Sequence, residues 1–188
     1  MFSVKVALFA FISFAALALA IPSPVGQLQP GSQDPRALIL SCNDQLAVAV
    51  LPLHYLTHAN ATSECVGAVI EEVVDILEML VGALSGLSLS GCGCTVHDII
   101  ASIAITLKII FEALGIVFGL YSGLDSLLGP LVALVVELLK VVLALVGGLV
   151  GELLILLISN GCAGIILDLK LGPLINCLGL GGLLGHLS

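Results

Sequence analysis

Long runs of aliphatic residues dominate the second half of the chain, and they define its predicted helices. The longest run covers residues 131–158, in which only Glu137, Lys140 and Glu152 are charged. A helix that is apolar on nearly all sides is either buried in a large core or exposed to a non-aqueous surface. A chain of this size cannot bury all of these side chains in one core. The pattern therefore predicts a protein with much apolar surface.

One segment, residues 63–84, has a clear amphipathic pattern. Its aliphatic residues recur at helical spacing, and Ser63 is in the position of a helix cap. The acidic residues of this segment share one face: Glu64, Glu71, Asp75 and Glu78. We expect this helix to form the water-facing side of a bundle.

Further helices are predicted around this segment. A short helix over 46–51, capped by Asn43 or Asp44, should be interrupted by Pro52. Longer apolar helices are predicted over three ranges: 96–122, 124–146 and 149–159. The tail, 162–188, is rich in Gly and Leu and should form short helices at most. The fold class is thus all-α, a bundle of about four hydrophobic helices.

The N-terminal part divides into two segments that precede this bundle. Residues 1–20 have a basic start, an apolar stretch and a small-x-small end, which is typical of a cleaved secretory signal peptide. Residues 21–40 contain four of the seven prolines and are predicted to be a flexible polar linker. The hydrophobic helical domain then covers 41–188.

Composition and charge narrow the possible partners. Only 10% of the residues are charged, against about 25% in an average globular protein. Thirteen Asp and Glu face five Lys and Arg, so a nucleic-acid role is excluded for lack of a basic surface. The expected partners are a hydrophobic interface, a wall polymer or lipid, or further copies of the chain.

Cysteine usage predicts covalent cross-links. The six cysteines all follow the signal peptide: Cys42, Cys65, Cys92, Cys94, Cys162 and Cys177. An even number in an oxidising compartment favours three disulfides. We expect Cys92 and Cys94 to pair with Cys42 and Cys65, and Cys162 to pair with Cys177. The alternative is that the thiols are free and buried.

Two local patterns indicate a modification and a mode of packing. Asn60-Ala61-Thr62 is an acceptor sequence for N-glycosylation. Gly115, Gly119 and Gly123 stand four residues apart, a spacing that lets helix backbones approach each other closely.

No pattern of catalytic or metal-binding residues stands out. His54 and His58 lie four apart, but Tyr55 occupies the position where a metalloprotease motif has Glu. The presence of Glu137 in an apolar run is best explained by an ion pair with Lys140. Lysines recur in Leu107-Lys108-Ile109, Leu139-Lys140-Val141 and Leu169-Lys170-Leu171, a weak repeat that would correspond to a duplicated helical hairpin. We expect no enzyme activity, no cofactor and no metal.

A multi-spanning membrane protein is the main alternative to a secreted one. The apolar runs are long enough to insert into a bilayer. Single charges interrupt each run, however, and basic residues gather at no helix end. The secreted location, extracellular or in a cell wall, is therefore preferred to the membrane.

The order of signal peptide, short Pro-rich segment and long Gly- and Leu-rich hydrophobic portion resembles the small secreted hydrophobic cell-wall proteins of mushroom-forming fungi. The resemblance covers the layout of the whole chain and includes no specific motif. It implies a structural, surface-active role in aerial hyphae formation and attachment. Hydrophobins themselves have adjacent Cys-Cys pairs, whereas the nearest approach here is Cys92-Gly93-Cys94.

Overall fold

The computed structural model describes residues 34–89, 93–120 and 125–179. These residues belong to one compact unit, 31–188, and their regular structure is entirely helical. The predicted all-α class is therefore confirmed for the described part of the chain. The predicted signal peptide and most of the predicted linker lie outside the described residues.

Seven α-helices and one 3-10 helix follow one another in the described part of the chain. Their bounds are α2 Pro35–Ala49, η1 Leu51–Tyr55, α3 Ser63–Leu84, α4 Val96–Phe118, α5 Asp125–Leu145, α6 Val150–Ser159, α7 Cys162–Asp168 and α8 Gly172–Cys177.

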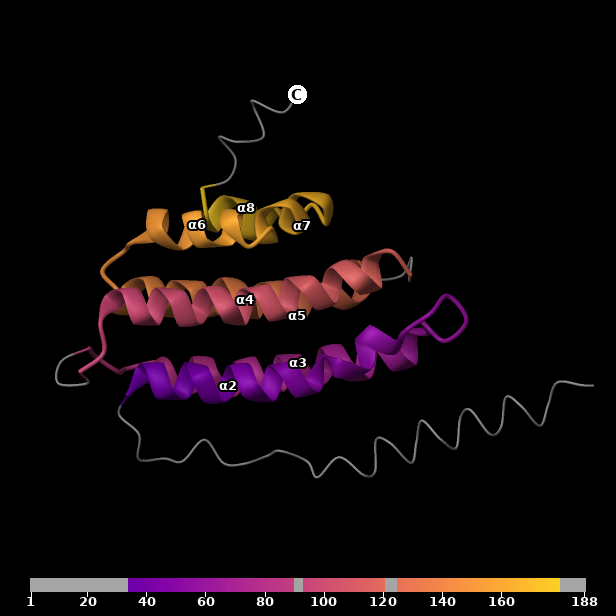
Figure 1. Ribbon diagram of the computed structural model, residues 1–188, viewed down its shortest axis with the longest axis horizontal. Helices are drawn as coiled ribbons and strands as arrows, with labels where there is room; N and C mark the ends of the chain where they lie inside the picture. The colour runs from indigo at the N-terminus through magenta and orange to yellow at the C-terminus, as the bar shows by residue number, and fades with distance from the viewer. Residues whose placement is uncertain (1–33, 90–92, 121–124, 180–188) are drawn as a thin grey trace, which may run out of the picture. The chain divides into compact units, whose positions relative to one another are not determined.

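The helices are stacked in three layers (Figure 1). The first layer consists of α2 and α3, which pack side by side, and the second layer consists of α4 on α2 and α5 on α3. The third layer consists of α6 and α7 on α4, and of α8 on α5. Helices α2 and α4 run in the same direction, because Arg36 contacts Asp98 and Asn43 contacts Ser102.

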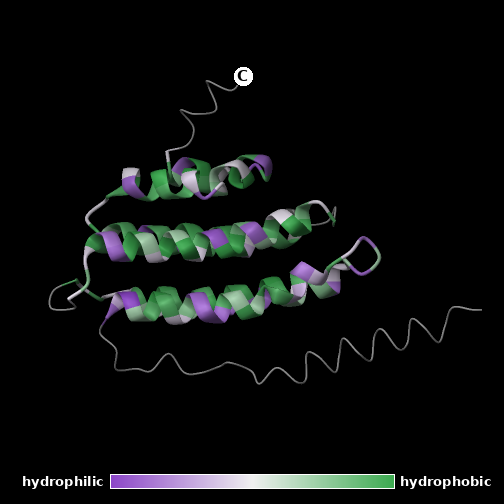
Figure 2. Cartoon of the chain, in the orientation of Figure 1, coloured by the Kyte–Doolittle hydropathy of each residue, from purple (hydrophilic) through white to green (hydrophobic). Residues whose placement is uncertain are grey.

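The core lies between these layers and is almost entirely aliphatic. Fully buried side chains come from both of the first two layers, among them Ile39, Leu77 and Phe111. Helix α4, covered from below and above, buries twelve of its residues. Colouring by hydropathy shows that apolar residues continue through all three layers (Figure 2). The central position of α4 explains why its sequence is apolar on most sides.

Helix α2 begins earlier than predicted and is longer. Asp34 caps it by accepting a hydrogen bond from the Arg36 backbone N–H at 2.9 Å, and Pro35 occupies its first turn. Proline suits this position because the first backbone N–H groups of a helix have no partner within the helix. Residues 35–40, expected to belong to the linker, are therefore helical. Asn43, one of the two expected caps, lies inside the helix.

The other helices agree closely with the predicted ranges. Helix α3 has the predicted bounds, although Thr62 rather than Ser63 caps it by accepting from the Cys65 N–H at 3.2 Å. Thr95 and Asp98 form a reciprocal capping box at the start of α4. The tail contains the short helices α7 and α8, as expected. Residues 180–188 lie outside the described part.

The predicted disulfide pairing is wrong, because Cys42, Cys65, Cys162 and Cys177 are free thiols. Each predicted bridge requires at least one of these four. Cys65 is the third residue of the 22-residue helix α3, so it lies about 29 Å from the last residue of that helix, where the loop to α4 begins. Cys162 faces α4, near Lys108 and Glu112, whereas Cys177 belongs to α8, which packs on α5. Cys92 lies outside the described residues.

Candidate functional site

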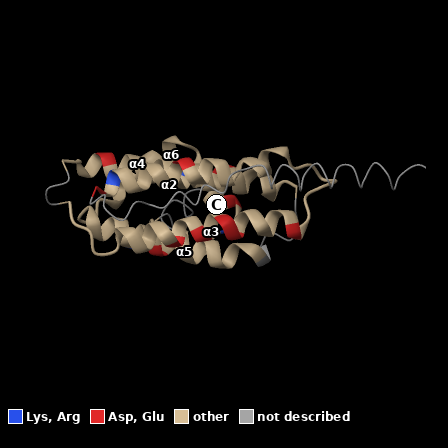
Figure 3. Ribbon diagram, turned by 90° about the horizontal axis from the view of Figure 1, so that it is seen from below, with Lys and Arg blue, Asp and Glu red and all other residues tan. Residues whose placement is uncertain are grey.

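An acidic surface covers the outer side of α3. Its five carboxylates are all exposed: Glu64, Glu71, Glu72, Asp75 and Glu78. The opposite side of α3 buries nine aliphatic residues against α2 and α5. A view of the molecule from below shows acidic residues on α3 and very few basic ones (Figure 3). We call these five carboxylates the acidic face.

An apolar surface lies on α6, in the third layer. Of its ten residues only Leu153 and Leu157 are buried. Ile155 is 67% exposed, Ile158 is 49% exposed, and Leu149 immediately before the helix is 47% exposed. The outer side of α2 also exposes Leu40 and Val48, but Ser41 and Asp44 lie between them. Ile155 and Ile158 lie about 60° apart around the helix axis, and we call these two residues the apolar face.

Charge is distributed unequally between the layers that carry these two faces. Residues 34–84, which include the first layer, contain seven carboxylates and Arg36 as the one basic group other than histidine. Residues 149–179, which include the third layer, contain Glu152, Asp168 and Lys170 as their only charged residues. In the described part of the molecule, charge is therefore densest in the first layer and sparsest in the third, with the second layer between the two extremes.

Three helical segments of the described chain are long and apolar enough to cross a membrane: Pro35–Tyr55, Val96–Phe118 and Leu127–Leu145. Helices α6 and α7 are long and apolar enough to cross a membrane only when they are counted together, and the chain bends by 88° at the break between them. The acidic helix α3 is not among these segments.

A buried polar network, which the sequence analysis missed, connects the first two layers. The Asn43 side-chain amide donates to the Ser102 carbonyl at 3.1 Å, and the Thr106 hydroxyl donates to the Asn43 side-chain oxygen at 2.6 Å. All three residues are buried, and no buried side-chain polar atom in the described residues lacks a partner. The signal in the sequence was a single Asn within an apolar helix, where a buried amide needs a partner.

A groove of about 500 Å³ lies between α5 and the turn that joins α7 to α8. The α5 side runs from Leu128 to Lys140, and the turn contributes Leu169–Pro173. No Asp or Glu lines the groove, whereas Lys140 and Lys170 both do. Neither lysine belongs to an ion pair, including the expected pair of Lys140 with Glu137; the ion pairs of the described residues involve Arg36, His97 and Lys108.

The burial of two cysteines controls their protonation. Burial raises the pKa of the Cys42 thiol to about 12. Burial, followed by the nearby Glu112 carboxylate, raises the pKa of Cys162 to about 11. Both thiols stay protonated near neutral pH and are poor nucleophiles. They are structural parts of the core, as the alternative of free buried thiols expects.

The predicted packing glycines lie in different environments. A side chain added at Gly115 would meet Ile165 of α7 at 3.6 Å, so this glycine does lie at a helix–helix contact. Gly119 ends α4 and would meet only the Ile116 carbonyl oxygen, at 3.8 Å. Gly123 lies outside the described residues.

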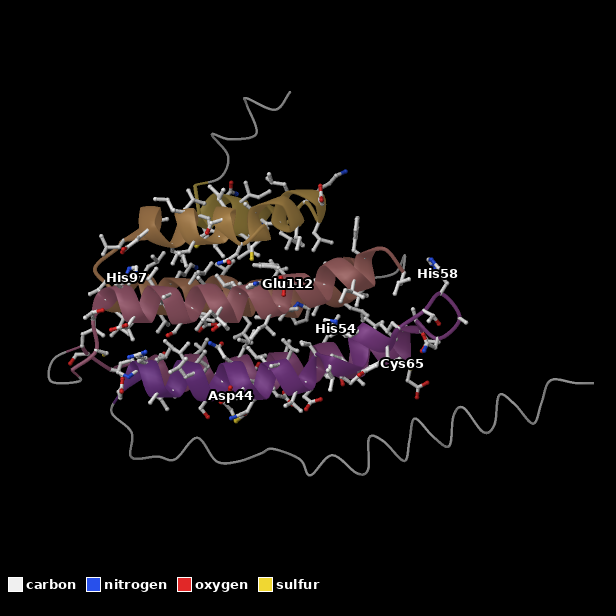
Figure 4. The ribbon with its side chains drawn as sticks, in the orientation of Figure 1. Asp44, His54, His58, Cys65, His97 and Glu112 are labelled. Atoms are coloured by element: carbon white, nitrogen blue, oxygen red, sulfur yellow. The ribbon has the colours of Figure 1, made fainter. Side chains whose placement is uncertain are left out.

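The remaining candidate residues lie near the turn between η1 and α3 (Figure 4). His54 and His58 are exposed. No group of three or more His, Cys, Asp or Glu within the described chain could hold a metal ion. Asn60 is partly exposed, and its side-chain oxygen accepts from the Thr57 hydroxyl at 3.0 Å.

The arrangement offers two contrasting surfaces and one lysine-lined groove. Comparison of the chain with models of protein families, with curated proteins and with solved structures finds no significant match.

Proposed function

We propose that this protein is a secreted, non-enzymatic, surface-active protein that adsorbs at an air, cell-wall or lipid interface. The observation that carries the proposal is the placement of the acidic face and the apolar face on different outer layers. An amphiphile of this kind lies with its apolar face at the interface and its acidic face in water. Removing apolar surface from water contributes about 25 cal/mol per Å², so even roughly 500 Å² contributes about 12 kcal/mol.

The position of α3 supports adsorption over insertion into a bilayer. Helix α3 packs along α2 and α5, two of the helices with span-like composition. A bilayer around those helices would also surround the exposed carboxylates Glu71, Glu72, Asp75 and Glu78. Each would cost about 2.5–3.5 kcal/mol near the bilayer centre, or on the order of 10 kcal/mol together.

An integral membrane protein is the second candidate function. The observation that favours it is the presence of three helical segments with the length and composition of spans. Alkaline carbonate extraction of the native host separates the two candidates. A secreted product is recovered from the medium or wall, and a spanning protein stays in the membrane pellet.

Surface tension at an air–water interface tests the primary proposal. The purified full chain, at micromolar concentration, is expected to lower the surface tension. The double variant Ile155→Lys/Ile158→Lys places two charges in the apolar face and is expected to adsorb more slowly and to a lower surface pressure.

Met79→Lys is the matched control, because Met79 is 41% exposed but lies among the carboxylates of α3. It is expected to adsorb like the unmodified protein. The proposal fails if the unmodified protein leaves the surface tension unchanged, or if Met79→Lys impairs adsorption as much as the double variant does. Far-UV circular dichroism of each variant checks that the helices are intact.

A further inference from the structure

We infer that the groove between α5 and the α7–α8 turn binds a single-chain anionic amphiphile, namely a fatty acid whose carboxylate is attracted by the two lysines that line the groove, Lys140 and Lys170. This binding site is distinct from the apolar face on α6, and it does not depend on the surface activity proposed above.

The shape of the groove suits one acyl chain. Its α5 side extends from Leu128 to Lys140, which is about 18 Å along the helix axis. Gly129 and Ala133, both exposed, leave room for a ligand on this side, while Val132 and the turn residues Leu169 and Leu171 supply apolar walls. The groove has a volume of about 500 Å³ and is largely open to solvent along its length.

The charges of the groove select an anion. The described chain contains only four Lys and Arg residues, and Lys140 and Lys170 are the two that line this groove. The other two are engaged, since Arg36 pairs with Asp98 at 4.0 Å and Lys108 with Glu112 at 3.7 Å. In a protein with a net charge of −8, two unpaired ammonium groups beside an apolar slot form a local site of positive potential.

The backbone at Lys170 is a second, independent observation. Its φ of 52° is the only positive φ of a non-glycine residue in the described chain. The Lys170 N–H donates to the Leu167 carbonyl at 3.0 Å and the Leu171 N–H to the Ile166 carbonyl at 3.1 Å, a Schellman motif that ends α7. Glycine usually occupies this position because it adopts the left-handed conformation without strain. A side chain kept in such a conformation points to a role for that side chain.

A fatty acid matches both parts of the site. Its carboxylate complements the two ammonium groups, and its single chain occupies a slot lined by aliphatic residues. A neutral alcohol of the same chain length lacks the first feature, and acetate lacks the second. These three compounds therefore separate the contributions of charge and apolar contact.

Isothermal titration of the full secreted chain with monomeric palmitate tests the inference. We expect saturable binding at one palmitate per chain. Cetyl alcohol should bind about tenfold or more weakly, because two charge contacts are lost. Acetate should give no measurable binding.

Substitutions in the groove, each with a matched control, locate the site. Lys140→Gln should weaken palmitate binding about fivefold, the effect of one exposed charge pair, whereas Lys108→Gln should leave it unchanged. Ala133→Phe should fill the slot and abolish binding, whereas Ala144→Phe, also exposed on α5 but outside the groove, should not.

Lys170→Gly separates a functional role of the lysine from a structural one. Glycine relieves the left-handed backbone, so the midpoint of thermal unfolding should not fall, while palmitate binding should weaken. Non-saturating uptake, equal binding of cetyl alcohol, or equal effects of the groove variants and their controls would each overturn the inference. The groove variants should retain normal surface tension activity, so the two proposals fail separately.

Discussion

Helices α3 and α6 are both rich in aliphatic residues, yet they present opposite surfaces to solvent. Helix α3 has five carboxylates along its outer side and buries nine residues. Helix α6 has one charged residue, Glu152, and buries only two. The comparison teaches that the surface character of this protein depends on where its few charges lie, because aliphatic residues are abundant everywhere.

The two helices also differ in how they are enclosed. Helix α3 lies against α2 on one side and α5 on another, whereas α6 contacts α4 and the short α7. A substitution that creates a cavity lowers the free energy of unfolding more at a well-enclosed position, because the surrounding side chains cannot collapse into the cavity. The first two layers should therefore be the more stable part of the molecule, and three predictions test this view.

The largest effect is expected from a cavity in the first layer. Leu77→Ala on α3 should lower the free energy of unfolding by about 3–5 kcal/mol, and Leu157→Ala on α6 by about 2–3 kcal/mol. Both leucines are fully buried, so urea unfolding of the two variants compares the layers directly. Met79→Ala, at an exposed position of α3, is the control and should change stability by less than about 1 kcal/mol. Equal losses for the two leucines would mean that the third layer is as firmly enclosed as the first.

The next effect concerns the polar contacts between layers. Asn43→Ala should destabilise the protein by about 2 kcal/mol, because both buried hydrogen bonds of the Asn43 side chain, to the Ser102 carbonyl and from the Thr106 hydroxyl, are lost. A polar contact between the third layer and α4 is the exposed His97–Glu152 pair at 2.9 Å, and His97→Ala should lower the free energy of unfolding by about 1 kcal/mol or less. Thermal unfolding of both variants measures the difference. A larger loss of stability for His97→Ala than for Asn43→Ala would show that the His97–Glu152 pair stabilises the fold more than the buried network does.

The last effect, which is the smallest at neutral pH, is a dependence of stability on alkaline pH. An unfolded thiol has a pKa near 9.0, whereas folding raises the pKa of Cys42 to about 12 and that of Cys162 to about 11. The folded state therefore retains protons that the unfolded state loses, and stability present below pH 9 declines as the pH rises toward these values. Each thiol should contribute a loss of about 1.4 kcal/mol per pH unit in this range.

Urea unfolding of the reduced protein between about pH 8 and pH 10.5, compared with Cys42→Ala and Cys162→Ala, measures these slopes. Each substitution should remove one of them. A slope that Cys42→Ala leaves unchanged would show that the first layer opens locally at α2 and ionises the thiol without unfolding.

The sequence predicted the helices well where their pattern repeats over many turns. Helix α3 has the predicted bounds because a charged stripe opposite an aliphatic stripe is specific to helical spacing. The start of α2 was missed because residues 21–40 have the composition of a linker, although Asp34-Pro35 is itself a helix-start signal. The disulfides were predicted from a count of cysteines, and a count contains no information on the distance that a long helix puts between two of them.

The groove could not be predicted, because it depends on contacts between distant segments. Lys108, Lys140 and Lys170 form a weak repeat in the sequence, but Lys108 and Lys140 lie within long helices and Lys170 lies in a turn. The repeat therefore does not correspond to one repeated structural unit. Only the packing of α8 on α5 brings two of these lysines to the same groove.

The pairing of α2 with α4, and of α3 with α5, has a consequence for biosynthesis. A helix of the first layer meets its partner in the second layer only after the intervening helix has been synthesised. The inner aliphatic side of α2 thus remains uncovered until α4 is complete at residue 118, and that of α3 until α5 is complete at residue 145. A nascent chain in this interval exposes surface that aggregates readily, so we expect its yield in a cell to depend on chaperones that shield the first half of the protein while the second half is made.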